Sequence, residues 1–306
     1  MKDKDLLYKR FESFAHINPQ ANALNYGDYT ITYGDLNSKA NRLSNHLIAK
    51  GIGTSTSVAL LLEHGPDIPL AILAVAKAGA HYVPISLDDP SKKIRTTLNE
   101  FKCKHIISNV SIDIGNDIDV IRIDSDKLDQ YINEENPNIK VKESDLTYIM
   151  STSGSTGIPK GVQIEHGNLI YYIDWYINNL KADQQGQLPF TSSYIFAASV
   201  TQIYVPLVTG ECLHIIPPTI SQNSQLLFNW FNKNPNFGLY TVPTLWEEHM
   251  IYAKANTIKL PAFLVITGEE LKEKLVTDTF DYDSNITIWN LYGPTETVAN
   301  ITYTKV

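Results

Sequence analysis

Hydroxyl-bearing residues and glycines surround one lysine near the middle of the chain, in the stretch 151–161 (STSGSTGIPKG). Glycine lets backbone N–H groups converge on an anion without interference from a Cβ atom, and serine and threonine hydroxyls donate further hydrogen bonds to phosphate oxygens. Lys160 adds a positive charge on a flexible stem. These residue types predict a loop that binds a polyphosphate.

The spacing in this loop differs from that of a Walker A loop, in which glycine directly precedes the lysine and serine or threonine follows it. Here Pro159 precedes Lys160 and Gly161 follows it, which argues against a Walker-type kinase or ATPase. A flexible linker is the alternative interpretation of such a composition. A linker, however, need not follow an apolar strand, predicted at 146–150, or precede another, predicted at 162–165.

Four motifs together resemble those of the acyl-adenylate-forming superfamily. This superfamily includes acyl- and aryl-CoA synthetases, luciferases and the adenylation domains of nonribosomal peptide synthetases. The longest motif, 146–169, is similar to the phosphate-binding core motif. The others are 31–36 (ITYGDL), 77–84 (KAGAHYVP) and 290–296 (NLYGPTE), in the expected order. The resemblance covers essentially the whole chain and is greatest to peptide-synthetase adenylation domains.

The resemblance implies a site for ATP and Mg²⁺. The β- and γ-phosphates would contact the loop residues Ser151, Thr152, Ser153, Gly154, Ser155, Thr156, Gly157 and Lys160. Tyr292 would stack on the adenine, Asn290 would meet its exocyclic amine, and Gly268 would lie against the nucleotide. Thr295 and Glu296 are the implied catalytic residues: Thr295 near the α-phosphate, and Glu296 as the metal ligand, since Mg²⁺ prefers carboxylate and phosphate oxygens. Outside the motif, Glu296 would be interpreted as a solvated turn carboxylate.

The implied reaction is attack of a substrate carboxylate on the α-phosphate of MgATP, which yields an acyl-AMP and pyrophosphate. The protein would contribute positioning and charge neutralisation. In a second step the acyl group would pass to the phosphopantetheine thiol of a carrier protein. Two alternatives remain: an acyl- or aryl-CoA ligase, and a non-catalytic module that binds a nucleotide or a partner.

One departure from the family's pattern concerns the substrate. Members that activate amino acids carry an aspartate after an aromatic residue (F-D-x-S-V), and it pairs with the α-ammonium. Here Ala197 follows Phe196, and no aspartate occurs between Asp183 and Asp278. Because a buried ammonium without a carboxylate is costly, we predict an acid other than an ordinary α-amino acid. An aryl, α-keto, hydroxy, β-amino or fatty acid would fit; a glutamate elsewhere or a water-lined pocket is the alternative.

The resemblance also implies a set of substrate-contacting positions, most of them small and neutral. They are Phe196, Ala197, Ala198, Thr201, Tyr240, Val265, Thr267, Leu291, Ala299 and Asn300.

The elements that must position these residues alternate between strands and helices. Short apolar strands are predicted at 58–62, 81–84 and 105–108, separated by helical periodicity at 68–78 and 92–101. Beyond the loop a second alternating set is predicted, with helices at 168–180, 199–208 and 222–233 and strands at 212–216, 238–241, 263–267 and 287–291. This order is typical of an α/β fold, with two stacked, mainly parallel sheets flanked by helices.

The resemblance predicts how the chain is divided. Residues 52–175 would form one subdomain, 1–50 plus 189–306 a second, and the active site would lie between them. The chain stops at Val306, where the family continues with a small β-barrel and a mobile C-terminal lid domain that carries a catalytic lysine. We therefore expect a truncated N-terminal core, a split half or a degenerate fragment, which alone would bind ATP weakly and adenylate slowly or not at all.

Charge, cysteine content and hydropathy argue against several other classes of protein. The formal net charge of −8 argues against non-specific nucleic-acid binding. Cys103 and Cys212 form neither a disulfide framework nor a metal spacing. The N-terminus lacks the apolar region of a signal peptide, and no run approaches the ~18 apolar residues of a membrane span. We expect a cytoplasmic protein with neither a nucleic-acid nor a membrane partner.

Overall fold

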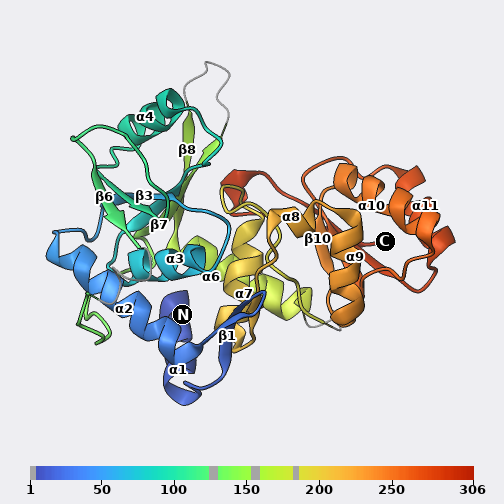
Figure 1. The fold of residues 1–306 in the computed structure, drawn as a ribbon, viewed down its shortest axis with the longest axis horizontal. Helices are drawn as coiled ribbons and strands as arrows, with labels where there is room; N and C mark the ends of the chain where they lie inside the picture. Colours follow the sequence, from blue (N-terminus) through green and yellow to red (C-terminus); the bar gives the residue numbers. More distant parts are fainter. Residues whose placement is uncertain (1–4, 124–129, 153–158, 182–185) are drawn as a thin grey trace.

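The computed structural model describes residues 5–123, 130–152, 159–181 and 186–306. The strands form three sheets, flanked by helices (Figure 1). The largest has the order β6-β5-β3-β4-β7-β8, and its strands are β3 (Ser57–Leu61), β4 (His81–Pro84), β5 (His105–Ser108), β6 (Asp119–Arg122), β7 (Leu146–Thr152) and β8 (Lys160–Glu165). All neighbouring pairs are parallel except β7 and β8, which form an antiparallel hairpin.

The second sheet contains β10 (Leu239–Thr241), β11 (Phe263–Ile266), β12 (Thr287–Tyr292) and β13 (Thr302–Lys305). The first three are parallel, and β13 is antiparallel to β12. The third sheet, which the sequence did not indicate as separate, joins the hairpin of β1 (Asn22–Tyr26) and β2 (Tyr29–Thr32) to β9 (Leu213–His214). The expected mixed α/β architecture is confirmed.

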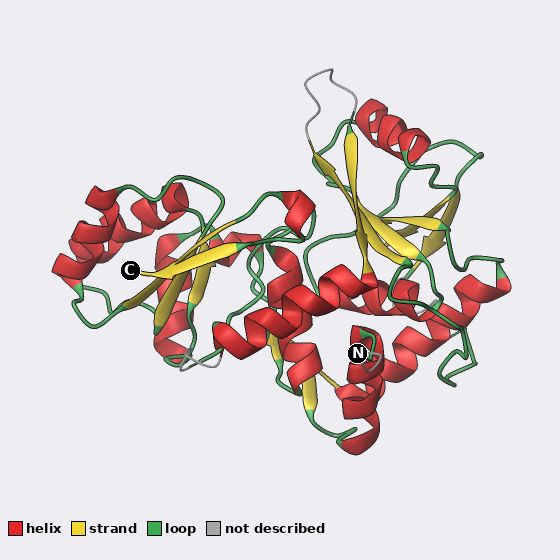
Figure 2. Ribbon diagram, turned by 180° about the vertical axis from the view of Figure 1, so that it is seen from behind, coloured by secondary structure: helices red, strands yellow, loops and turns green. Residues whose placement is uncertain are grey.

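The helices cover these sheets and connect them. They are α1 (Leu7–Ile17), α2 (Tyr33–Ala49), α3 (Asp67–Lys77), α4 (Ser91–Glu100), α6 (His166–Asn179), α7 (Ser199–Thr209), α8 (Pro218–Ser221), α9 (Ser224–Lys233), α10 (Pro243–Asn256) and α11 (Glu273–Tyr282). Seen from behind, α1 and α2 lie below the six-stranded sheet, near the N-terminus (Figure 2). No helix in the described ranges has the length and apolar composition needed to cross a membrane.

The central strands of both large sheets are buried on two faces, which explains their continuous apolar runs. On β3, Val58 and Leu60 enter a core that they share with α3 and α7, whereas Ala59 and Leu61 enter a smaller core beside α4. The four-stranded sheet repeats this alternation. Its outer face packs under α9, α10 and α11, and its inner face joins the core shared with α6 and α7. One shared core therefore connects the two large sheets.

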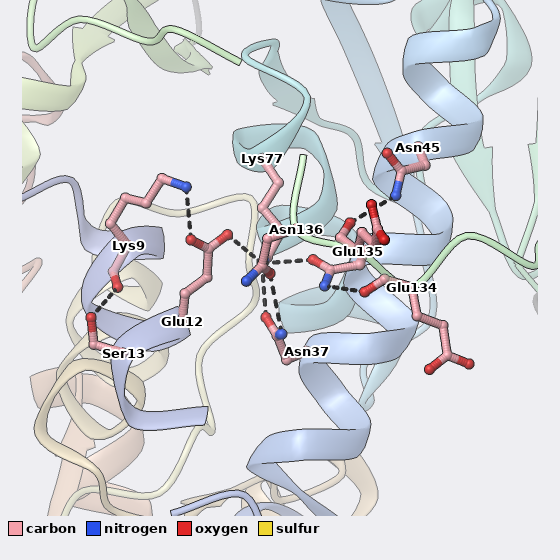
Figure 3. Close-up of polar contacts among 10 residues, drawn as sticks. Lys9, Glu12, Ser13, Asn37, Asn45, Lys77, Glu134, Glu135 and Asn136 are labelled. Atoms are coloured by element: carbon pink, nitrogen blue, oxygen red, sulfur yellow. Dashed lines mark hydrogen bonds and ion pairs between the residues drawn. The ribbon is translucent and has the colours of Figure 1, made fainter. Parts of the chain in front are cut away.

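Lys77, at the end of α3, is fully buried and joins three parts of the chain (Figure 3). Its Nζ lies 2.6 Å from Glu12 Oε1, 2.8 Å from the side-chain oxygens of Asn37 and Asn41, and 3.1 Å from that of Asn136. Burial lowers the pKa of Lys77 to about 8, and the Glu12 carboxylate opposes this shift. Lys77, the first residue of the motif 77–84, therefore connects α3 to α1, α2 and the segment before β7 through buried contacts.

The structure differs from the sequence expectations in a few elements. The helix predicted at 222–233 starts two residues later, as α9 at Ser224, and the short α8 that ends at Ser221 was not predicted. The side chain of Asn223 caps α9 by accepting from the backbone N–H of Leu226 at 3.1 Å. Helices α10 and α11 and strand β13 were not anticipated. The division into residues 52–175 and 1–50 plus 189–306 stays a prediction.

Candidate functional site

A cavity of about 490 Å³ opens at the carboxyl ends of β10 and β11 and beside the turn after β12. Open α/β sheets bind ligands at this edge. The cavity's other wall is the segment 191–198, which precedes α7. Predicted substrate residues that line it are Phe196, Ala197, Ala198, Tyr240, Thr267, Ala299 and Asn300. Thr201, Val265 and Leu291 do not line it, because their side chains are buried in the interior.

A buried hydrogen-bond network connects four of the predicted residues. Asn300 Nδ2 donates to the hydroxyl of Tyr240 at 3.1 Å, and Asn300 Oδ1 accepts from Thr267 Oγ1 at 3.0 Å. Asn300 Nδ2 also donates to Tyr172 Oη at 3.1 Å, and that hydroxyl lies 2.7 Å from Thr201 Oγ1. The sequence did not indicate Tyr172, which lies on α6, more than a hundred residues before Asn300.

Two further residues that the sequence did not indicate position the wall 191–198. Gln202 Oε1 accepts from the backbone N–H groups of Thr191 and Ser192. The hydroxyl of Tyr194 contacts the carbonyl oxygens of Leu60 and Ile85, at 2.9 and 2.8 Å. Since these carbonyls lie just at or after the ends of β3 and β4, Tyr194 ties the cavity wall to the six-stranded sheet.

The ends of the predicted phosphate loop lie beside this cavity. Ser151 and Thr152 end β7, and Lys160, whose side chain is exposed, begins β8. Ser151 and Thr152 line a second cavity of about 390 Å³, and the exposed ring of Phe196 borders both cavities. The strand after the loop confirms that it is not a Walker loop. The loop residues Ser153, Gly154, Ser155, Thr156 and Gly157 lie outside the described residues.

The residues predicted to meet the nucleotide cluster at the end of β12. Tyr292 ends this strand with its ring 67% exposed, and Asn290 lies half-buried two residues earlier. Gly268, at φ +88°, and Thr295 both line the larger cavity. Glu296 lies next to Thr295 in the short 3₁₀ helix η2 (Thr295–Thr297) and is exposed. An exposed aromatic ring such as that of Tyr292 suits stacking on a planar base.

The turn after β12 is unusually tight. A Cβ atom on Gly293 would lie 2.5 Å from both the carbonyl oxygen of Ala299 and the Cα of Asn300. Val298 has φ +76°, which is rare for a β-branched residue, and its N–H donates to the carbonyl of Thr295 at 3.2 Å. Such strain persists where the surroundings hold the backbone, and here it brings Ala299 and Asn300 to the cavity.

The larger cavity is almost free of charge. Among the described residues, Glu269 is its only charged lining side chain. Glu269 Oε2 accepts from the backbone N–H of Thr244 at 3.1 Å and from its hydroxyl, so it caps the start of α10. Burial raises the pKa of Tyr240 well above its usual value, which keeps that phenol neutral. The described residues contain no group of three or more His, Cys, Asp or Glu side chains placed for a metal, so Glu296 as a metal ligand stays a prediction.

The family model described as AMP-binding enzyme matches residues 11–306, and the chain belongs to that family. Its relatives include tyrocidine synthase 1 of Brevibacillus parabrevis, 28% identical over 95% of this chain and 26% of that protein. The chain therefore spans about a quarter of this relative's length.

Solved structures share the fold. The NpsA N-terminal subdomain of Klebsiella oxytoca, in complex with 3-hydroxybenzoyl-AMSN, superposes with a TM-score of 0.86 and 24% identity, over 99% of this chain and 76% of that one. NpsA-ThdA, an artificially fused adenylation–PCP di-domain from the same organism, has a TM-score of 0.87 and 24% identity, over 100% of this chain and 61% of that one. The predicted N-terminal core fold of adenylation domains is thereby confirmed.

Proposed function

We propose that the protein activates a carboxylic acid with ATP. A carboxylate oxygen attacks the α-phosphorus, the bond from that phosphorus to the bridging oxygen of the pyrophosphate breaks, and acyl-AMP and pyrophosphate result. The observation that supports this most directly is the position of the neutral cavity. Its lining includes Gly293, which follows the exposed Tyr292, and Phe196, which also borders the second cavity lined by Ser151 and Thr152 at the end of β7.

The side chains have separate roles in this proposal. Tyr292 stacks on the adenine, and Gly268 leaves room for the nucleotide. Lys160 and the loop hydroxyls neutralise the β- and γ-phosphates, and Thr295 donates a hydrogen bond near the α-phosphate. Glu296 would hold Mg²⁺, which supplies charge neutralisation on the phosphates when it is bound.

We further propose that the acid is not an ordinary α-amino acid. Ala197 lines the cavity where an ammonium-binding aspartate would stand. The one charged side chain of the described lining, Glu269, is exposed and already accepts two hydrogen bonds from Thr244. An ammonium in the cavity would therefore lose hydration without gaining a buried carboxylate. The aromatic acyl group held by NpsA on the same fold supports an aryl acid as one candidate.

Transfer of the acyl group to a phosphopantetheine thiol on a carrier protein is the proposed second step. The relationship to tyrocidine synthase and the adenylation–PCP fusion support it. Free CoA is the competing acceptor. Consumption of free CoA by the full-length protein, without loading of a carrier, would assign the protein to the CoA ligases instead.

ATP–pyrophosphate exchange tests the first step. The full-length protein is given aryl, α-keto, hydroxy, β-amino and fatty acids in parallel with the proteinogenic α-amino acids. We expect exchange with a member of the first group. Strong exchange only with a proteinogenic α-amino acid would contradict the proposed substrate class. MgATP binding in calorimetry without exchange for any acid would indicate a non-catalytic nucleotide-binding module.

A further inference from the structure

Both N–H groups of the Asn300 side chain are engaged inside the protein. Its two N–H groups donate to the hydroxyls of Tyr172 and Tyr240, and its oxygen accepts from Thr267. An amide nitrogen carries two hydrogens, so neither is left for a molecule in the cavity. Asn300 lines the cavity, but in this arrangement it offers a ligand no donor.

Tyr172 holds the amide of Asn300 in this arrangement, although Tyr172 itself does not line the cavity. It is 4% exposed. Its hydroxyl accepts from Asn300 and shares a hydrogen bond with Thr201 Oγ1 on α7. Burial raises the pKa of Tyr172 to about 12, and its hydrogen bonds to Thr201 and Asn300 act in the opposite direction. One neutral phenol thus links α6, α7 and the segment after η2.

The hydroxyl of Tyr240 differs from that of Tyr172 in one respect. It accepts from Asn300, but among the described residues it donates to no acceptor. Since Tyr240 lines the cavity, its O–H hydrogen is available to a ligand placed beside Asn300. A ligand with one neutral hydrogen-bond acceptor, such as a hydroxyl or carbonyl oxygen, would match it.

We propose that Tyr172 is a positioning residue that determines which acids the cavity accepts, an inference that rests on the proposed function. By accepting one N–H of Asn300, Tyr172 keeps the amide turned away from the ligand, so that a ligand beside Asn300 meets the Tyr240 hydroxyl and not an amide donor. Without the Tyr172 hydroxyl, an N–H of Asn300 and the Oγ1 of Thr201 lose their partner in a buried place. Because unpaired buried polar groups are costly, the amide then turns its free N–H toward the cavity.

The first test needs no substrate. The 306-residue chain is labelled with ¹⁵N-asparagine, and the side-chain NH₂ signal of Asn300 is assigned by its loss in Asn300→Asp. Tyr172→Phe is expected to shift this signal. Tyr282→Phe is the matched control, because it removes a partly buried hydroxyl that donates to the carbonyls of Ala253 and Ile258. It should leave the Asn300 signal unchanged. An Asn300 signal that Tyr172→Phe does not shift overturns the inference, whatever acid the protein activates.

The second test uses the exchange reaction with pairs of acids that differ by one hydroxyl, such as 3-hydroxybenzoate and benzoate. Tyr172→Phe should raise the ratio of kcat/KM for the hydroxylated acid to that for its partner by about two- to tenfold, the range expected for one hydrogen bond. The KM for ATP should stay constant, and Tyr282→Phe should change neither. An unchanged ratio alongside a shifted Asn300 signal would overturn the specificity role. Absence of exchange with every acid would count against the proposed function, and the NMR result alone would then decide on the positioning role.

Discussion

Gln202 Oε1 lies 2.8 Å from the backbone nitrogen of Thr191, at the point where the cavity wall begins. The same oxygen accepts from the backbone N–H of Ser192 at 3.1 Å, and Gln202 Nε2 donates to Ser192 Oγ at 2.6 Å. Gln202 itself is buried, so water does not readily replace it. One side chain on α7 therefore satisfies two backbone groups of the wall.

Gln202→Ala should lower both stability and affinity for the acid. It leaves two backbone N–H groups unpaired, each at a cost of about 1–3 kcal/mol. We expect a lower Tm and a higher KM for the acid in pyrophosphate exchange. Gln202→Glu keeps the accepting oxygen and should retain more of both. Equal effects of the two substitutions would show that side-chain volume, not the hydrogen bonds, matters.

Ala197→Asp should convert the cavity toward α-amino acids. The new carboxylate would pair with an α-ammonium in a neutral environment, where charge-assisted hydrogen bonds are strong. We expect exchange with at least one proteinogenic amino acid to rise about tenfold or more. Ala197→Asn is the control of equal size without charge. An equal gain in the asparagine variant would contradict the electrostatic explanation.

Tyr292→Ala should weaken nucleotide binding. Stacking between a base and an aromatic side chain contributes about 1–3 kcal/mol, so the Kd for MgATP should rise roughly 5- to 100-fold in calorimetry. Tyr171 on α6 is similarly exposed and lies outside both cavities, so Tyr171→Ala should leave the Kd unchanged. A normal Kd in the Tyr292 variant would remove this residue from the site.

Gly293→Ala should destabilise the protein and disturb the cavity. The added Cβ would meet backbone atoms of Ala299 and Asn300 at 2.5 Å, and backbone cannot move aside as a flexible side chain can. Overpacking typically costs about 1–3 kcal/mol, which should appear as a lower Tm. The control is Gly53→Ala, whose Cβ would be no closer than 3.8 Å to the carbonyl oxygen of Ala78. A comparable loss in both variants would argue against the close approach at Gly293.

His166 should make the protein sensitive to acid. Burial lowers the pKa of His166 to about 4, against 6.5 for an unperturbed histidine, with Asp145 opposing the shift. Between these pH values the unfolded chain binds more protons than the folded one. The free energy of unfolding should therefore fall as the pH is lowered from 6.5 to 4, by up to about 1.4 kcal/mol per pH unit.

His166→Gln removes this proton uptake, so denaturant titrations should show a smaller loss of stability over that range. His16 lies exposed in α1, and His16→Gln should leave the wild-type slope. An unchanged slope in the His166 variant would assign the acid sensitivity to other groups, such as His249, whose pKa burial also lowers to about 4.

The sequence predicted the elements whose apolar pattern matches their burial. Strand β3 is the clearest case, because its successive residues enter cores on opposite faces of the sheet. Helix α10 was missed for the opposite reason. Its apolar Ile251 is exposed and its polar His249 is buried, so hydrophobicity does not mark the buried face. Strand β13 has four exposed residues, and only its backbone pairing with β12 defines it.

The candidate site likewise contains residues that the sequence predicted and residues that it did not. Gly268 and Thr295, which the family resemblance indicated, both line the cavity, and their roles there stay predictions. Tyr172 and Gln202 belong to no motif, and their roles depend on contacts that only the folded chain creates. Val265 and Leu291 were predicted to contact the substrate, but they do not line the cavity because their side chains are buried in the shared core.

The buried contacts of Lys77 limit where this chain can be recombined with a relative to change its substrate. The lysine's four acceptors come from α1, α2 and the segment before β7, so they span residues 12 to 136. A crossover within that span would pair a buried cation from one parent with acceptors from the other. Junctions placed after Asn136 keep the whole set within one parent, and chimaeras built there should express as folded protein more often.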